Sequence, residues 1–169
     1  MPTATFRVFF VFVVFSHARR RILHIDVTAH PTAAWTAQQL REAFPWDTVP
    51  RFLLRDRDAI HRFALQRTVQ RMGFDQVLTA PRATWHNPFV ERLIGSLRRE
   101  CLDHVIVWNE RALRRCLSQY VAYFHTFRTH LPLEKDAPIS RQVQLPTAGA
   151  IVEVSQLGGL HHHDERRAA

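Results

Sequence analysis

The apolar run over residues 6–16 constrains the fold most, because residues 6–15 are almost wholly phenylalanine and valine. Ten residues are too few to cross a bilayer as a helix. The main positive charge, residues 19–21, follows the run, whereas a signal peptide carries its charge in front. Aromatic and β-branched residues instead favour a buried strand. With a turn over 17–20 and a second strand over 21–28, the sequence predicts a β-hairpin.

Helical and strand-like segments alternate through the rest of the chain. Thr32 and Asn109 are suited to cap helices, while Pro45 and Gly73 are suited to end them. We predict helices over about 33–43, 60–72, 88–101 and 109–127, and short strands over 51–55 and 74–79. This order is typical of an α/β domain with a mixed sheet. We expect a core over residues 1–140 and a flexible tail over 141–169, where proline and polar residues thin the pattern.

The charge balance is basic, with 23 Lys and Arg against 15 Asp and Glu, a net charge of +8. Such a balance favours a polyanionic partner such as nucleic acid. Lys135 is the only lysine, and arginine's planar fork suits phosphate, although a genome rich in arginine codons explains the same bias. Cys101 and Cys116 fit no zinc or redox spacing, so we expect reduced thiols in a cytoplasmic protein.

Three carboxylates stand where an α/β domain places chemistry. Asp56 and Asp58 directly follow a predicted strand, and Glu91 lies early in the helix predicted after a proline-containing loop. Carboxylates from a strand end and a helix can hold a pair of Mg²⁺ ions for phosphoryl transfer. The alternatives are a solvated turn with local ion pairs for the two aspartates and an ordinary helix face for Glu91.

Several motifs in order between residues 53 and 138 resemble the catalytic core of DDE-type integrases and insertion-sequence transposases. The aspartate after a short strand and the glutamate after Asn-Pro both match that family's pattern. A basic helix that closes on Arg-Glu follows, and then come an aromatic stretch, an Arg-x-His motif and a late Ala-Pro. The matching stretches are His86-Asn87-Pro88-Phe89-Val90-Glu91, Ser96-Leu97-Arg98-Arg99-Glu100, Tyr120-Val121-Ala122-Tyr123-Phe124-His125, Arg128-Thr129-His130-Leu131-Pro132-Leu133 and Ala137-Pro138.

This resemblance implies a ribonuclease-H-like mixed sheet flanked by helices, and DNA strand transfer that depends on Mg²⁺ or Mn²⁺. It implies Asp56 and Glu91 as catalytic residues and metal ligands. Of the two aspartates, Asp56 leaves 34 residues before Glu91 and Asp58 leaves 32, so Asp56 fits the family's spacing better and Asp58 is the alternative.

The front of the chain departs from the family pattern. The family's first aspartate lies in a strand that would precede Met1, and Asp26 lies in the register of a later strand. We therefore expect a truncated core that lacks its first strand and is weakly active or inactive, which leaves open whether this chain is an enzyme. A missing strand would expose backbone groups and apolar surface, so we also expect poor solubility or oligomerisation.

The resemblance also implies DNA contacts. Arg82, Arg98 and Arg99 are candidate phosphate ligands, and Trp85 could stack on a base; ordinary surface or core roles are the alternatives. We expect element ends and target DNA as partners, a homo-oligomer, no membrane and a cytoplasmic location. Two other functions stay open: a non-catalytic nucleic-acid-binding remnant, and a ribonuclease-H-like nuclease that cleaves without joining.

Two further patterns have plain structural explanations. The aromatic residues of 120–127 recur at three or four positions, which predicts a buried helix stripe. Arg128 and His130 follow that helix, and capping of its end is the simplest interpretation.

Overall fold

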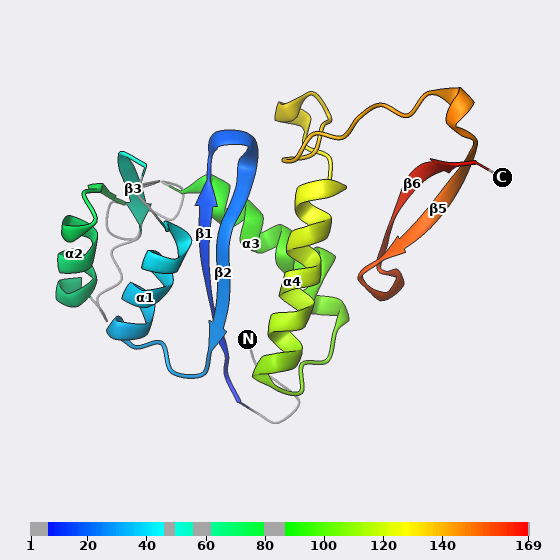
Figure 1. The fold of residues 1–169 in the computed structure, drawn as a ribbon. Coiled ribbons are helices and arrows are strands. Elements are labelled where there is room, and N and C mark those ends of the chain that lie inside the picture. Colours follow the sequence, from blue (N-terminus) through cyan, green and yellow to red (C-terminus); the bar gives the residue numbers. More distant parts are fainter. Residues whose placement is uncertain (1–6, 46–49, 56–61, 80–86, 169) are drawn as a thin grey trace.

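The computed structural model describes residues 7–45, 50–55, 62–79 and 87–168 (Figure 1). The side chains of residues 62–65 are not part of that description. The strands are β1 (Phe10–Ser16), β2 (Arg21–Thr28), β3 (Phe52–Arg55), β4 (Asp75–Leu78), β5 (Ala150–Gln156) and β6 (His161–Arg167). The helices are α1 (Ala33–Ala43), α2 (Arg62–Arg71), α3 (Pro88–Glu100) and α4 (Glu110–Thr126). The predicted α/β order is confirmed.

The predicted hairpin forms from β1 and β2, which pair antiparallel with Val13 opposite Ile25. Its turn holds Arg19 and Arg20 at φ of 47° and 52°, a region that residues with a Cβ seldom adopt. Arg19 is held there by contacts with a distant loop: its guanidinium donates to the Asp136 carboxylate and to the Pro138 carbonyl, each at 3.0 Å.

Local capping signals set the helix ends as predicted. The Thr32 hydroxyl accepts from the Trp35 amide at 3.1 Å, and the Asn109 side chain accepts from the Ala112 amide at 2.8 Å. Pro88 opens α3, where its missing amide costs nothing. Gly73, at φ 80°, turns the chain from α2 into β4.

The single mixed sheet that we expected is not seen among the described residues. The strands form separate pairs instead: β1 with β2 antiparallel, β3 with β4 parallel, and β5 with β6 antiparallel. Both pairing types of a mixed sheet are present, but a cavity lies between β1 and β3 where the two pairs would have to join. A ribonuclease-H-like sheet and a missing first strand therefore stay predictions.

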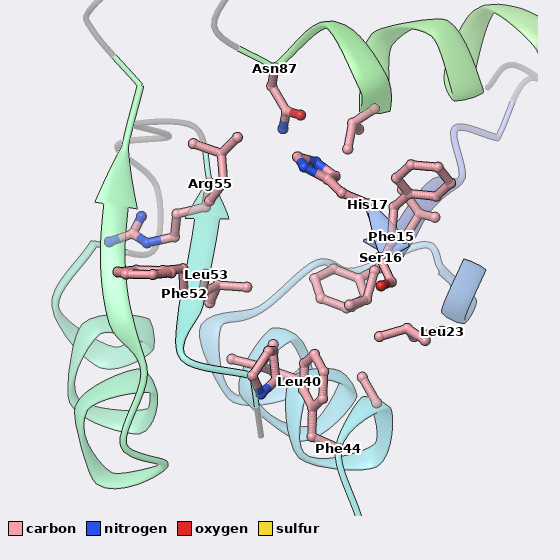
Figure 2. Close-up of a pocket in the computed structure, with 17 residues that line it drawn as sticks. Phe15, Ser16, His17, Leu23, Leu40, Phe44, Phe52, Leu53, Arg55 and Asn87 are labelled. Atoms are coloured by element: carbon pink, nitrogen blue, oxygen red, sulfur yellow. The ribbon is translucent and has the colours of Figure 1, made fainter. Parts of the chain in front are cut away.

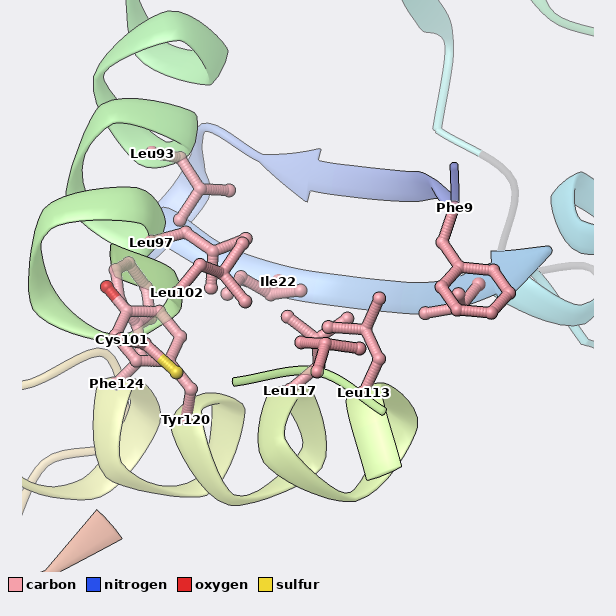
Figure 3. Packing of buried hydrophobic residues seen from close by; sticks show 12 residues of the cluster. Phe9, Ile22, Leu93, Leu97, Cys101, Leu102, Leu113, Leu117, Tyr120 and Phe124 are labelled. Atoms are coloured by element: carbon pink, nitrogen blue, oxygen red, sulfur yellow. The ribbon is translucent and has the colours of Figure 1, made fainter. Parts of the chain in front are cut away.

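The described residues bury two separate apolar clusters. The large core joins α3 and α4 to the hairpin, and Figure 3 shows side chains of α4 directed toward both. The small core joins β1 and α1 to the end of α2 and to Phe74, which directly precedes β4. The large core comprises Phe9, Ile22, Val27, Leu93, Leu97, Cys101, Leu102, Val107, Leu113, Leu117, Tyr120 and Phe124. The small core comprises Val14, Leu40, Phe44, Val69 and Phe74.

Residues 150–167 differ from the flexible tail that we predicted, because they form the hairpin β5–β6. Alternating β-branched residues and the turn at Gly158-Gly159 explain this structure. The hairpin packs on α4: the His161 ring stacks on Tyr123 at 4.5 Å and the His163 ring on Phe127 at 3.6 Å. The domain boundary at residue 140 stays a prediction.

Within the described ranges, every helix is too short or too polar to span a membrane.

Candidate active site

Glu91 lies in the first turn of α3, and its side chain is exposed. Its carboxylate makes no hydrogen bond or ion pair to any other described residue, so its oxygens are available to a ligand. The positive end of the helix dipole favours a negative charge at this position. The helix begins here because Pro88 fixes its first turn.

The two faces of α3 have different roles. Leu93, Ser96 and Leu97 are buried against the rest of the fold, whereas Arg98 and Arg99 are exposed in the last turn. Arg98 stands seven residues after Glu91, which places both on one face about 10 Å apart along the axis. Neither arginine side chain pairs with a described carboxylate.

Four of the predicted site residues lie outside the described residues: Asp56, Asp58, Arg82 and Trp85. Their neighbours are described. β3 ends at Arg55, directly before Asp56, which agrees with the prediction that this aspartate follows a strand. Among the described residues, no group of three or more His, Cys, Asp or Glu side chains is arranged to hold a metal ion.

A cavity of about 670 Å³ joins the two halves of the candidate site. Its lining comes from β1, β2, α1, β3 and the start of α3. Arg55, next to Asp56 in sequence, and Val90, next to Glu91, both line it. Figure 2 shows Arg55 and Asn87 toward the same end of this space. The fold therefore brings the chain neighbours of both predicted catalytic residues to one cavity.

Asn87 is a lining residue that sequence reasoning did not single out. Its side chain is 7% exposed, and its Oδ1 has no hydrogen-bond partner among the described residues. Although it precedes α3 directly, its side chain does not cap the helix. A buried acceptor without a partner costs about 1–3 kcal/mol, so this position favours a bound donor. In the sequence, the Asn-Pro step indicates only the family motif, because a sequence does not display burial.

The Arg128 side chain binds α3 rather than capping α4, which replaces our simpler interpretation. Its guanidinium donates to both Glu100 oxygens, at 2.8 and 2.7 Å, and to the Ser96 hydroxyl at 3.1 Å. The Tyr120 hydroxyl donates to the same carboxylate at 2.9 Å. Burial acts to raise the pKa of Glu100, but hydrogen bonds and charge from Arg128 outweigh it, so this pKa lies below its usual value.

His130 lies beside the Arg128 guanidinium that binds Glu100. It is 9% exposed and lies edge-on to Phe124, with ring centroids 4.9 Å apart. Burial, followed by the positive charges of Arg128 and Arg20, lowers the pKa of His130 to about 4. The Arg-x-His motif thus supplies one charged residue that fixes α3 to α4 and one neutral residue that packs beside it.

Residues 72–138 match the family described as the integrase core domain. The match covers β4, α3 and α4, and includes Glu91, Arg98 and Arg99. No curated protein matches the chain. Residues 72–138 are thus similar to an integrase core domain, and this match suggests a function related to DNA integration or transposition. Our predicted resemblance over residues 53–138 is confirmed for this part.

Proposed function

We propose that this chain serves DNA integration or transposition through Mg²⁺-dependent strand transfer, with Asp56 and Glu91 as the metal-holding carboxylates. Asp58 is the alternative to Asp56. One observation carries the proposal: Arg55 and Val90, the chain neighbours of the two carboxylates, line one cavity. Residues of the matched integrase-core segment and of β3 thus approach the same space.

The donor chemistry fits a hard divalent cation. Glu91 offers exposed carboxylate oxygens without a competing partner among the described residues, and Mg²⁺ and Mn²⁺ both prefer oxygen ligands. When bound, such ions activate an attacking oxygen and stabilise a leaving one. The protein's own contribution is to hold Glu91 at a fixed helix start, with Pro88 setting the first turn and the Glu100–Arg128 pair fixing the other end.

DNA is the proposed partner, bound as element ends and target by a homo-oligomer in the cytoplasm. Arg98 and Arg99 support this role, because both are exposed in the last turn of α3 and unpaired with described carboxylates. We assign them to phosphate contacts, together with Arg82, and assign Trp85 to stacking on a base. Neutralised phosphates release counterions, so binding should weaken steeply with salt.

The test is a strand-transfer assay with labelled duplex DNA and either Mg²⁺ or Mn²⁺. We expect metal-dependent cleavage or joining that Glu91→Gln and Asp56→Asn abolish. The matched control is Glu110→Gln, which alters the first-turn glutamate of α4 instead. Loss of activity in Asp58→Asn but not in Asp56→Asn would move the assignment to Asp58. Equal activity in wild type and Glu91→Gln would refute the metal-site assignment.

A second function is a non-catalytic DNA-binding remnant, supported by the exposed Arg98 and Arg99 of α3, which can contact phosphate without any metal. In that case DNA binding would fall with salt, with a log–log slope of about −0.9 per phosphate contact, but no metal would promote cleavage. Cleavage without joining would instead identify a ribonuclease-H-like nuclease.

A further inference from the structure

Two large apolar side chains are exposed in the loop that leads from α3 to α4. Ile106 is 71% exposed and Trp108 is 64% exposed, whereas Val107 between them is buried in the large core. The backbone is extended at Val105, and in an extended chain successive side chains point to opposite sides. Burial of Val107 therefore directs its two neighbours outward, so the fold itself presents them to solvent.

Two arginines follow on the outer face of α4. Arg111 and Arg115 are exposed and lie four positions apart, which places them on one side of the helix, about 6 Å apart along its axis. Trp108 precedes Arg111 by three positions and stands directly before the capping residue Asn109, so their Cα atoms lie within about 11 Å. A large aromatic ring and two cations are thus presented together at the start of α4.

Neither of these arginines pairs with a carboxylate in the described part of the chain. Two acidic groups at this end of α4, Glu110 and Asp26, are both bound by Arg114, at 2.7 and 2.6 Å. Arg111 and Arg115 repel each other at their spacing, and Arg111 also lies in the first turn, at the positive end of the helix dipole. Both positions cost stability in the chain alone, so a bound polyanion explains them better than folding does.

This surface is remote from the candidate active site. Phe89, in the first turn of α3, lies 4.6 Å from His17 at the turn of the β1–β2 hairpin, measured between ring centroids. Arg114 of α4 instead binds Asp26 and Val27, near the other end of β2. Strands rise about 3.3 Å per residue, so the two contacts lie roughly 15–20 Å apart. Figure 1 shows the start of α4 at the end of the hairpin that is opposite its turn.

We propose that the start of α4 is a second nucleic-acid surface, one that binds an unpaired stretch of a strand. Trp108 stacks on a base, and Arg111 and Arg115 contact phosphates of the same strand. Ile106 packs against the apolar face of a neighbouring base. The inference rests on the proposed function for its partner, DNA, and adds a contact that is separate from Glu91 and from the arginines of α3.

Other partners match fewer of these features. A single phosphate ion would satisfy the arginines but leave Trp108 exposed. A second copy in a two-fold contact would bring the same arginines to the interface, and the chain has a net charge of +8, so like charges would meet. Duplex DNA offers phosphates but keeps its base faces stacked within the helix. A single strand supplies both phosphates and an open base face.

The probe is fluorescein-labelled oligothymidylate of about 20 nucleotides, added to the full chain in EDTA so that no metal-dependent chemistry contributes. We expect a saturable change in anisotropy. The double change Arg111→Gln and Arg115→Gln should weaken binding at least tenfold at low salt and reduce the log–log salt slope by about 1.4, or about 0.7 per phosphate contact. The matched control, Arg41→Gln with Arg71→Gln, removes the same charge from exposed positions of α1 and α2 and should bind like wild type.

The aromatic contact has its own variants. Trp108→Ala should weaken binding about fivefold or more and leave the salt slope unchanged, because stacking releases no counterions. Trp108→Phe keeps an aromatic ring and should recover most of the affinity. Leu131→Ala, at an 81% exposed position beyond the other end of α4, is the matched control. Thermal unfolding of each variant checks that the fold is retained.

Three results would overturn the proposal: no saturable binding by wild type, an unchanged salt slope in the double-arginine variant, or unchanged affinity in Trp108→Ala. A changed oligomeric state of Trp108→Ala in sedimentation, at unchanged oligothymidylate affinity, would also overturn it, since Trp108 would then contact a second copy. The proposed strand transfer fails separately, because Glu91→Gln should leave oligothymidylate binding in EDTA unaffected.

Discussion

Among the described residues, the large core and the small core differ in the number of side chains that they bury. The large core buries twelve residues and is reinforced by the partly buried Glu100–Arg128 pair. The small core buries five of the described residues and adjoins the cavity. Glu91 stands on a helix anchored in the large core, whereas Asp56 follows β3, which adjoins the small core. The candidate site thus draws on both cores.

Truncation of a buried leucine should give the largest difference in the free energy of unfolding between the two cores. Leu117→Ala, at a position 1% exposed in the large core, should lower the free energy of unfolding by about 3–5 kcal/mol. Leu40→Ala should cost about 2 kcal/mol, because the neighbouring cavity lets its surroundings relax. Denaturant unfolding measures both. Leu131→Ala, 81% exposed, is the control, and a larger loss for Leu40→Ala than for Leu117→Ala would break the comparison.

The next largest effect should come from Arg128. Arg128→Leu leaves the Glu100 carboxylate partly buried without its partner, which should cost about 2–4 kcal/mol of stability. Arg51→Leu removes the exposed pair with Asp75 near the small core and should cost less than about 0.5 kcal/mol. Thermal unfolding checks both. Equal shifts would mean that the α3–α4 contact contributes no more than a surface pair.

Acidification should weaken the large-core end through His130. Its folded-state pKa of about 4 lies below the ordinary 6.5, so the unfolded chain binds more protons between these values. Stability should therefore fall as pH drops from about 6.5 to 4, by no more than about 3 kcal/mol. Glu100, whose pKa is also lowered, adds a further loss below about pH 4.5. His130→Gln should flatten the first window, whereas exposed His162→Gln should not.

Oxidation should give the smallest shift. The Sγ atoms of Cys101 and Cys116 lie 3.2 Å apart, and the hydrogen bond from Cys101 lowers the pKa of Cys116 to about 7. Hydrogen peroxide should join them, the two thiols losing two hydrogens as peroxide becomes water, and raise stability by about 1 kcal/mol. Mass spectrometry under non-reducing conditions detects the bond. Its absence in wild type, or an unchanged mass loss in Cys116→Ser, would contradict this pairing.

The sequence predicts structure that depends on contacts within one helical turn, but it does not predict contacts between residues far apart in the chain. Thr32, Asn109 and Pro88 mark helix starts through contacts within one turn, so the helices were predicted closely. Arg128 and Glu100 lie 28 residues apart, and the sequence does not display their contact. The separate sheet pairs and the buried Asn87 depend on tertiary packing for the same reason. The hairpin over 150–167 was missed because polar residues obscured its alternation.

The central claim is that Glu91 and the end of β3 share one cation site, and Mn²⁺ tests it most directly by paramagnetic broadening of backbone NMR signals. We predict selective loss of the Asn87, Val90 and Arg55 signals at low Mn²⁺, with recovery in both Glu91→Gln and Asp56→Asn. Broadening confined to the histidines of residues 161–163, or unchanged broadening in both variants, would contradict a metal site between α3 and β3.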